Sequence, residues 1–270
     1  MGTDRLDILG VPLDRVDRQE ALSKLYHATQ STGNRLFTVT TLNPEYVMAA
    51  RIMPVLREAV ERSDLIVCDG VGTQVGARVL HGQQACGISR LTGFEVAVLL
   101  AKWSAFGDSG GLFLLGGRDS RAAAKELVSL APEARIAGAW SGGSPAASMD
   151  AESIHRIRAS GASVVLVAYG APEQVLWIER NRQRLVDAGA KTAMGVGGVL
   201  DYLSGNAVLA PSLVRRAGLE WLYRLVREPW RIRRQSVLPV FALLVARDAL
   251  RVRLGAASHD DNRKHEPPEA

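Results

Sequence analysis

Short apolar runs, each followed by a turn and a stretch of helical spacing, recur along most of this chain. The run Leu65–Cys68 is long enough for one buried strand and too short for a buried helix. Strands that alternate with helices in this way predict an α/β fold, with a mostly parallel, Rossmann-like sheet covered by helices. The predicted strands are residues 6–11, 36–40, 65–68, 112–115, 136–140, 164–169 and 192–196.

The segments between these runs carry helix signals. Asp17 precedes a helical stretch that runs to Ala28, which predicts an N-cap at Asp17. Apolar side chains between Tyr46 and Val60 recur at helical intervals and predict a helix there. Another helix is expected over residues 175–185, after the strand at 164–169.

Asp69 follows the Leu65–Cys68 run directly, and Gly70 and Gly72 then allow a tight turn. In open α/β folds, ligands bind at the carboxyl ends of the strands, so this position suits a catalytic carboxylate. It suits equally well an Asp that caps the helix that follows. The spacing alone leaves both interpretations open.

The chain is basic, and its positive charge is concentrated near the C-terminus. The formal net charge is +5 and the isoelectric point is about 9.5, which predicts an anionic partner. Between residues 215 and 234 there are seven arginines and only two acidic residues. The anion-binding part of the protein is therefore expected in this arm.

Arg224, Arg227, Arg231 and Arg234 are spaced so that they would share one face of an ideal helix. Pro229 disturbs that helix, because a helix normally ends or kinks just before a proline. A basic face can simply be solvated, and basic residues interleaved with aromatic ones also suit nucleic acid. The segment that follows favours lipid.

Residues 237–246 are almost wholly apolar, and Arg247, Arg251 and Arg253 follow them. This run is too short to cross a bilayer, but an arginine-flanked amphipathic segment can lie in the membrane interface. We therefore expect an α/β catalytic core at 1–210, a basic amphipathic helical appendage at 211–255 that associates with the membrane, and a disordered tail at 256–270.

Several other classes of protein lack support in the sequence. No signal peptide or membrane-spanning stretch is expected. Cys68 and Cys86 make neither a disulfide framework nor a metal motif, the histidines are dispersed, and reduced cytosolic thiols are expected. A serine hydrolase also lacks support, because the Gly-X-Ser-X-Gly match at residues 107–111 precedes the strand expected at 112–115 and does not follow one as a nucleophile elbow does.

Taken together, an ordered set of short motifs resembles the WecG/TagA/CpsF family of glycosyltransferases. The set covers roughly residues 5 to 245, and the run from Glu220 to Pro229 is its most distinctive part. The matching stretches are Thr41-Leu42-Asn43-Pro44-Glu45, Asp69-Gly70-Val71-Gly72, Arg90 with Gly93-Phe94-Glu95, Gly170-Ala171-Pro172-Glu173-Gln174, Gly195-Val196-Gly197-Gly198, and Gly218 to Leu225 through Glu228-Pro229 to Arg234.

The resemblance implies inverting, metal-independent transfer of a sugar, typically of the N-acetylmannosamine type, from a UDP-sugar. The implied acceptor is a sugar linked to polyprenyl diphosphate, and the implied setting is the cytoplasmic face of the cell membrane, where cell-surface polymers are built. No cofactor, bound metal or nucleic acid is implied, and the pattern is compatible with a homo-oligomer. The absence of Asp-X-Asp, the usual cation motif of glycosyltransferases, agrees with the metal-free expectation.

The resemblance also assigns roles to individual residues. Asp69 matches the proposed general base, and Thr41 and Asn43 match polar residues near the base and the sugar. The remaining matches concern substrate binding: Arg90 and Gln174 in the pocket, Gly195, Gly197 and Gly198 where the backbone approaches the nucleotide, and Arg224, Arg231 and Arg234 in the appendage that is thought to close over the site.

Two departures from the family pattern bear on substrate choice. Val175 stands where the family usually has an acidic residue, and Ser141-Gly142-Gly143 replaces a more aromatic stretch. The alternatives are another UDP-hexose or uronic acid donor, a nucleotide-dependent oxidoreductase, and a non-enzymatic module that binds membrane or nucleic acid. Gly-X-Gly-X-X-Gly is absent after the first strand, which counts against the oxidoreductase.

Overall fold

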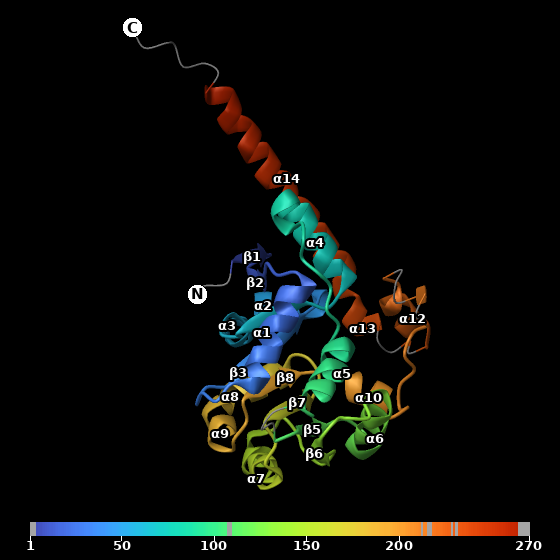
Figure 1. Cartoon of the computed structure of the whole chain (residues 1–270). Helices are drawn as coiled ribbons and strands as arrows, with labels where there is room; N and C mark the ends of the chain where they lie inside the picture. Colours follow the sequence, from blue (N-terminus) through green and yellow to red (C-terminus); the bar gives the residue numbers. More distant parts are fainter. Residues whose placement is uncertain are drawn as a thin grey trace.

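The computed structural model describes residues 4–106, 110–211, 213–214, 218–227, 229 and 232–263. Its centre is a six-stranded parallel sheet with the order β4-β3-β8-β7-β5-β6, which confirms the predicted α/β fold (Figure 1). The strands are β1 (Arg5–Ile8), β2 (Val11–Asp14), β3 (Phe37–Leu42), β4 (Leu65–Cys68), β5 (Leu112–Gly116), β6 (Ile136–Trp140), β7 (Val164–Ala168) and β8 (Thr192–Gly195).

Helices cover both faces of the sheet, and residues of alternate parity along each strand face opposite hydrophobic clusters. One face packs against α1, α5, α6 and α10, and the other packs against α2, α3, α7, α8 and α9. The helices are α1 (Arg18–Gln30), α2 (Pro44–Ile52), α3 (Pro54–Glu61), α4 (Val71–His81), α5 (Gly93–Trp103), α6 (Ser120–Leu130), α7 (Asp150–Ser160), α8 (Glu173–Arg180), α9 (Arg182–Asp187), α10 (Val199–Leu203), α12 (Glu220–Arg227), α13 (Ile232–Gln235) and α14 (Val237–Arg263).

The N-terminal segment is a hairpin, so the prediction of one strand over residues 6–11 was wrong. β1 and β2 pair in an antiparallel ladder around Leu9 and Gly10, whose φ angles of 56° and 91° are left-handed. The Gly10 N–H donates to the Asp7 carboxylate at 2.8 Å and closes the turn. Leu9 hid this turn from the sequence analysis, because a buried leucine seldom adopts a left-handed conformation.

Two expected helices are each divided into two. The stretch from Tyr46 to Val60 breaks at Met53, where Pro54 starts α3, because proline cannot donate the hydrogen bond that a continuous helix needs. The helix expected over residues 175–185 breaks at buried Asn181, whose side-chain amide donates to the Trp177 carbonyl. The N-cap predicted at Asp17 is confirmed, since its carboxylate accepts from the Glu20 N–H at 2.8 Å.

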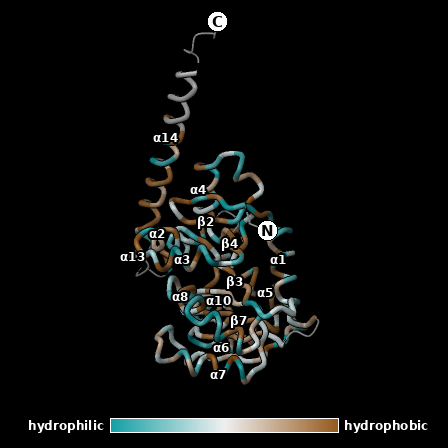
Figure 2. Tube along the Cα trace, turned by 90° about the vertical axis from the view of Figure 1, so that its left-hand side faces the viewer, coloured by the Kyte–Doolittle hydropathy of each residue, from teal (hydrophilic) through white to brown (hydrophobic). Residues whose placement is uncertain are grey.

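The long helix α14 lies along α4 and then extends away from the body of the molecule (Figure 1). Phe241, Val245 and Ala249 are buried at intervals of four residues, and hydrophobic colour marks this part of the helix in Figure 2. Gly76 of α4 makes close packing possible, because a Cβ atom there would lie 3.0 Å from the Phe241 ring. The helix continues past residue 256, where the sequence predicts a tail, and the expected boundaries at 210 and 255 stay predictions.

The order of the strands indicates where a ligand binds: at the carboxyl ends of the strands, called here the carboxyl edge or ligand-binding edge of the sheet. The chain leaves β3 into α2 on one face of the sheet, whereas it leaves the neighbouring β8 into α10 on the other face. In open parallel sheets the crevice for a ligand lies where such a switch occurs, beyond the carboxyl ends of the strands. The turns after β3, β4, β7 and β8 all lie on this edge.

Candidate active site

Asp69 extends the β4 strand by one residue at the ligand-binding edge. Its backbone N–H donates to the Leu42 carbonyl of β3 at 2.9 Å, so the ladder between the two strands continues to this position. The side chain is half-buried, and its Oδ1 accepts from the Gly93 N–H at 3.3 Å. Asp69 is therefore held from two sides, by a strand and by the start of a helix.

The structure excludes one of the two interpretations of Asp69 that the sequence left open. The N-cap of the following helix α4 is Gly70, and no side chain makes a capping bond there, so the helix-cap interpretation was wrong. The carboxylate lies instead at the N-terminus of α5, which already has its own capping box from Thr92 and Glu95. The positive end of a helix dipole stabilises an ionised carboxylate, the form that a general base requires.

Arg90 and Thr41, both predicted from the sequence, lie beside Asp69. The Arg90 backbone pairs with Cys68, the residue before Asp69, and Thr41 pairs with Val67 on β4. Burial, and then the negative charge of Asp69, raise the pKa of the Cys68 thiol to about 12, while Arg90 lowers it. The Cys68 thiol is therefore neutral at physiological pH, and the charged groups around it are Asp69 and arginines.

The turn after β3 packs directly against the turn that carries Asp69. Asn43 caps α2 by accepting from the Tyr46 N–H at 3.0 Å, and Pro44 is the first residue of the helix. A Cβ atom on Gly72 would lie 2.8 Å from the Pro44 ring, and one on Gly70 would lie 3.3 Å from it. These glycines let the β3 and β4 turns touch, which brings Asn43 close to Asp69.

Gln174 connects the turns after β7 and β8. Its side chain is 2% exposed, and its Oε1 accepts from the Gly197 N–H at 2.8 Å. The amide fills the space beside Gly195, where a Cβ atom would lie 2.7 Å from the Gln174 Cγ and Cδ atoms. Gly197 has a φ of 55°, which glycine adopts without strain. The predicted site residues Gln174, Gly195 and Gly197 thus form one packed unit.

This packing predicts different effects for two neighbouring glycine substitutions. We expect Gly195→Ala to displace Gln174 and to lower the free energy of unfolding by about 1–3 kcal/mol, together with a loss of ligand binding. Gly198→Ala is the matched control for stability alone, since its nearest neighbour would be an ordinary contact at 3.8 Å and its φ is −75°. Thermal unfolding is measured for both variants, and equal losses of stability would contradict the role assigned to Gly195.

The appendage begins beside the Asp69 turn. Gly218 packs on Val71, the first residue of α4, with 2.7 Å between the position of a Gly218 Cβ atom and the valine side chain. Of the appendage arginines predicted for the site, Arg231 lies outside the described residues. The backbones of Arg224 and Arg234 belong to α12 and α13, and their side chains lie outside the described part of the chain. Their contribution to the site stays a prediction.

The sequence analysis did not single out Asp201 or Tyr46 as residues that connect the turns around the candidate site. The Asp201 carboxylate accepts from the Arg118 N–H at 2.9 Å and connects the start of α10 to the glycine turn after β5. A signal was available, because both Asp201 and Asp69 lie close to a strand end and a glycine turn, although Asp201 comes after its glycines and Asp69 before them. Tyr46 gave no such signal, since a buried aromatic residue early in a helix is typical of a hydrophobic core.

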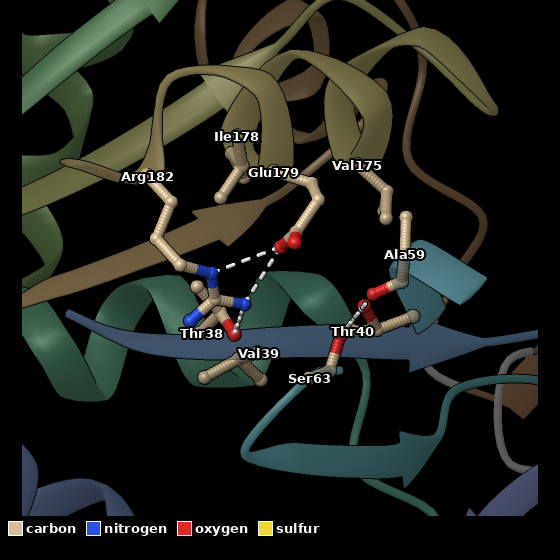
Figure 3. Close-up of a pocket in the computed structure, with 9 residues that line it drawn as sticks. All are labelled: Thr38, Val39, Thr40, Ala59, Ser63, Val175, Ile178, Glu179 and Arg182. Atoms are coloured by element: carbon tan, nitrogen blue, oxygen red, sulfur yellow. Dashed lines mark hydrogen bonds and ion pairs between the residues drawn. The ribbon is translucent and has the colours of Figure 1, made fainter. Parts of the chain in front are cut away.

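A small cavity lies at the other end of β3, away from this site (Figure 3). Its volume is about 10 Å³, roughly the space for one water molecule. The Thr40 and Ser63 hydroxyl groups lie 2.8 Å apart there, and Arg182 donates to Glu179 and to Thr38. This polar cluster satisfies buried groups between β3, α3 and α8, and it supports the fold.

Metal ligands and membrane spans were also sought in the described part of the chain. No three His, Cys, Asp or Glu side chains lie where they could hold a metal ion together. None of the helices is long and apolar enough to cross a bilayer. Cys68 and Cys86 are free thiols.

An open parallel sheet with a carboxylate, an arginine and glycine turns at the carboxyl ends of its strands is typical of an α/β enzyme that binds its ligand at those ends. Residues 6–255 match the model of the Glycosyl transferase WecG/TagA/CpsF family. The chain belongs to this family, as the motifs predicted, and is a glycosyltransferase of the hexosyltransferase class.

A curated relative supports the same assignment. The chain is 30% identical over 212 residues to the N-acetylglucosaminyldiphosphoundecaprenol N-acetyl-beta-D-mannosaminyltransferase of Bacillus subtilis (strain 168). The match covers 78% of this chain and 79% of that protein. The similarity therefore extends over most of both proteins.

Proposed function

We propose that this protein transfers an N-acetylmannosamine-type sugar from a UDP-sugar to a sugar linked to polyprenyl diphosphate, in the synthesis of a cell-surface polysaccharide or wall polymer. Family membership and the activity named for the relative support the sugar and the lipid-linked acceptor. The structural observation that carries the proposal is the position of Asp69, at the ligand-binding edge of the sheet and at the N-terminus of α5.

In the proposed reaction, Asp69 is the general base. Its carboxylate takes the proton from the acceptor hydroxyl as that oxygen attacks the anomeric carbon of the donor. The new carbon–oxygen bond forms on one face while the bond to UDP breaks on the other, so the configuration inverts. A positioned base of this kind contributes on the order of 10²–10⁴-fold to the rate. Its ionised form is favoured by the α5 dipole and by the Gly93 hydrogen bond.

UDP leaves with additional negative charge, which the protein must neutralise. Arg90 lies beside the base, and Arg224, Arg231 and Arg234 are the further candidates. Guanidinium groups suit phosphate oxygens because they donate two parallel hydrogen bonds. The contact of Gly218 with Val71 supports this role, since it starts the appendage beside the Asp69 turn.

The other predicted site residues line the same edge. Thr41 and Asn43 belong to the end of β3 and its turn and are proposed to contact the sugar or to orient the base. Gly197 and Gly198 begin the turn into α10, where a nucleotide can approach the backbone, and Gln174 and Gly195 support that turn. In this proposal, residues 1–210 form the catalytic core and residues 211–255 complete it.

We further propose that the protein works at the inner face of the cell membrane as a peripheral protein. Val240, Leu243 and Leu250 on α14 are 47%, 69% and 58% exposed, and Arg247 and Arg251 lie among them. Exposed apolar side chains of this kind can be buried in the membrane interface, and each basic residue near anionic lipid adds about 1 kcal/mol. Such attachment would place the site close to a lipid-linked acceptor.

The proposal is tested by incubating the protein with a panel of UDP-sugars and a short lipid-diphosphate acceptor and measuring the product mass. We expect N-acetylmannosamine transfer that continues in EDTA, because arginines rather than a cation neutralise the diphosphate. A product that carries another hexose or a uronic acid would show that the donor is a different UDP-sugar. A strict requirement for Mg²⁺ or Mn²⁺ would contradict the metal-free mechanism. Absence of both transfer and UDP binding would favour a non-enzymatic module.

A further inference from the structure

The amide of Gln174 is bonded inside the protein at both of its ends. Its Oε1 accepts from the Gly197 N–H at 2.8 Å, and its Nε2 donates to the Tyr46 hydroxyl at 2.6 Å. The Gly197 N–H can only donate, so it fixes the orientation of the amide and directs Nε2 to Tyr46. At 2% exposure, this amide is enclosed by the protein and does not line an open pocket.

Tyr46 connects this amide to the turn after β3. The residue is 3% exposed and lies in the first turn of α2, where its N–H donates to the Asn43 side chain at 3.0 Å. The ring thus spans from the start of α2 to the start of α8. Through Gln174 it also reaches the Gly197 turn, so the carboxyl ends of β3, β7 and β8 are joined.

The same chain of contacts continues to the carboxylate. Asn43 and Pro44, three and two residues before Tyr46, pack against Gly70 and Gly72, the two glycines that follow Asp69 in its turn. A displacement of the first turn of α2 therefore moves the surface against which the Asp69 turn rests. Pro44 and Tyr46 are buried, and close-packed interiors pass a displacement on from one contact to the next.

We propose that Tyr46 is a positioning residue for the transfer reaction. Its hydroxyl anchors the Gln174 amide, whose orientation the Gly197 N–H fixes, and the pair holds the Gly197 turn in a fixed relation to the Asp69 turn. The inference rests on the proposed function, in which the first turn approaches the donor nucleotide and the second carries the base. Correct relative placement of two such groups matters because displacements on the order of 1 Å can cost about 100-fold in rate.

Tyr46→Phe tests this role, since it keeps the ring and removes only the hydroxyl. A buried amide donor is then left without its acceptor, which favours movement of Gln174. We expect kcat to fall about tenfold while KM for the donor changes less than about threefold. An unchanged kcat would overturn the proposal.

A second comparison separates positioning from general destabilisation. In a Gln174→Leu background there is no amide to anchor, so adding Tyr46→Phe is expected to cause no further loss of kcat. The same tenfold loss in both backgrounds would show that Tyr46 acts by another route and would overturn the proposal. Thr29→Val is the matched control, because it removes another buried hydroxyl, which donates to the Tyr26 carbonyl at 2.8 Å in α1.

Amide hydrogen exchange provides a readout that needs neither substrate nor activity. Tyr46→Phe is expected to speed exchange in a peptide covering residues 195–199, and Thr29→Val is not. Unchanged protection of that peptide would overturn the proposal even where activity falls. Absence of transfer by the natural protein with every UDP-sugar would instead count against the proposed function, so the two failures are distinguishable.

Discussion

Asp69→Asn is expected to lower the rate of sugar transfer by about 10²–10⁴-fold and to leave the fold intact. The amide oxygen can still accept from the Gly93 N–H, so the link to α5 is retained, but the amide cannot take a proton from the acceptor. UDP binding should persist, because the base acts on the acceptor. The measurements are initial rates on a lipid-linked acceptor and calorimetric binding of UDP.

Asp187→Asn is the matched control for that substitution. Asp187 is exposed at the end of α9, just before the amino-terminal end of β8, and asparagine there can still accept from the Gln183 side chain, which donates to Asp187 at 2.9 Å. Transfer by this variant should match that of the natural protein. Near-normal turnover in Asp69→Asn would eliminate Asp69 as the base and leave Arg90 and the appendage arginines as the main source of catalysis.

Gly76→Leu is expected to separate the appendage from the core without removing a single arginine. A Cβ atom at this position already lies 3.0 Å from the Phe241 ring, so a larger side chain forces α14 away from α4. Overpacking of this kind costs about 1–3 kcal/mol, which can lower the docked population and the transfer rate by up to about 100-fold. Limited proteolysis between α10 and α12 should speed up in parallel.

Val75→Leu is the control on the same helix, because its side chain is 50% exposed and a leucine there meets solvent. Its proteolysis and transfer should both stay near those of the natural protein. Faster cleavage of Gly76→Leu together with unchanged transfer would show that the docked appendage is dispensable for the chemistry. The arginines proposed to hold UDP would then have to be sought within the core.

Local sequence patterns predicted most helices and strands correctly, and they failed where a single residue determined the end of an element. The run Leu65–Cys68 gave its strand correctly, because a strand that is covered on both faces must be apolar on both. The helix expected from Tyr46 to Val60 ended early at Met53, since a missing proline N–H outweighs hydrophobic periodicity. The hairpin at Leu9 was hidden for the opposite reason: the turn contains an apolar, buried residue.

The candidate site shows the same division. Asp69, Arg90 and Gln174 were predicted through an ordered set of motifs, which can be read directly from the sequence. Tyr46 was not found, because its role depends on one hydroxyl meeting an amide 128 residues further along the chain. Pairings over such distances leave no periodic signal.

By itself, the sequence determined the α/β fold, the family and the set of polar residues to consider, because these follow from local patterns and from motif order. Only the tertiary structure decided whether Asp69 caps α4, the helix that follows it. Gly70, and not Asp69, is the N-cap of α4, and the carboxylate faces the start of α5 instead. The physical reason is that β4 and α5 come together only through sheet pairing and helix packing. The contact between Asp69 and Gly93 therefore cannot be read from the order of residues along the chain.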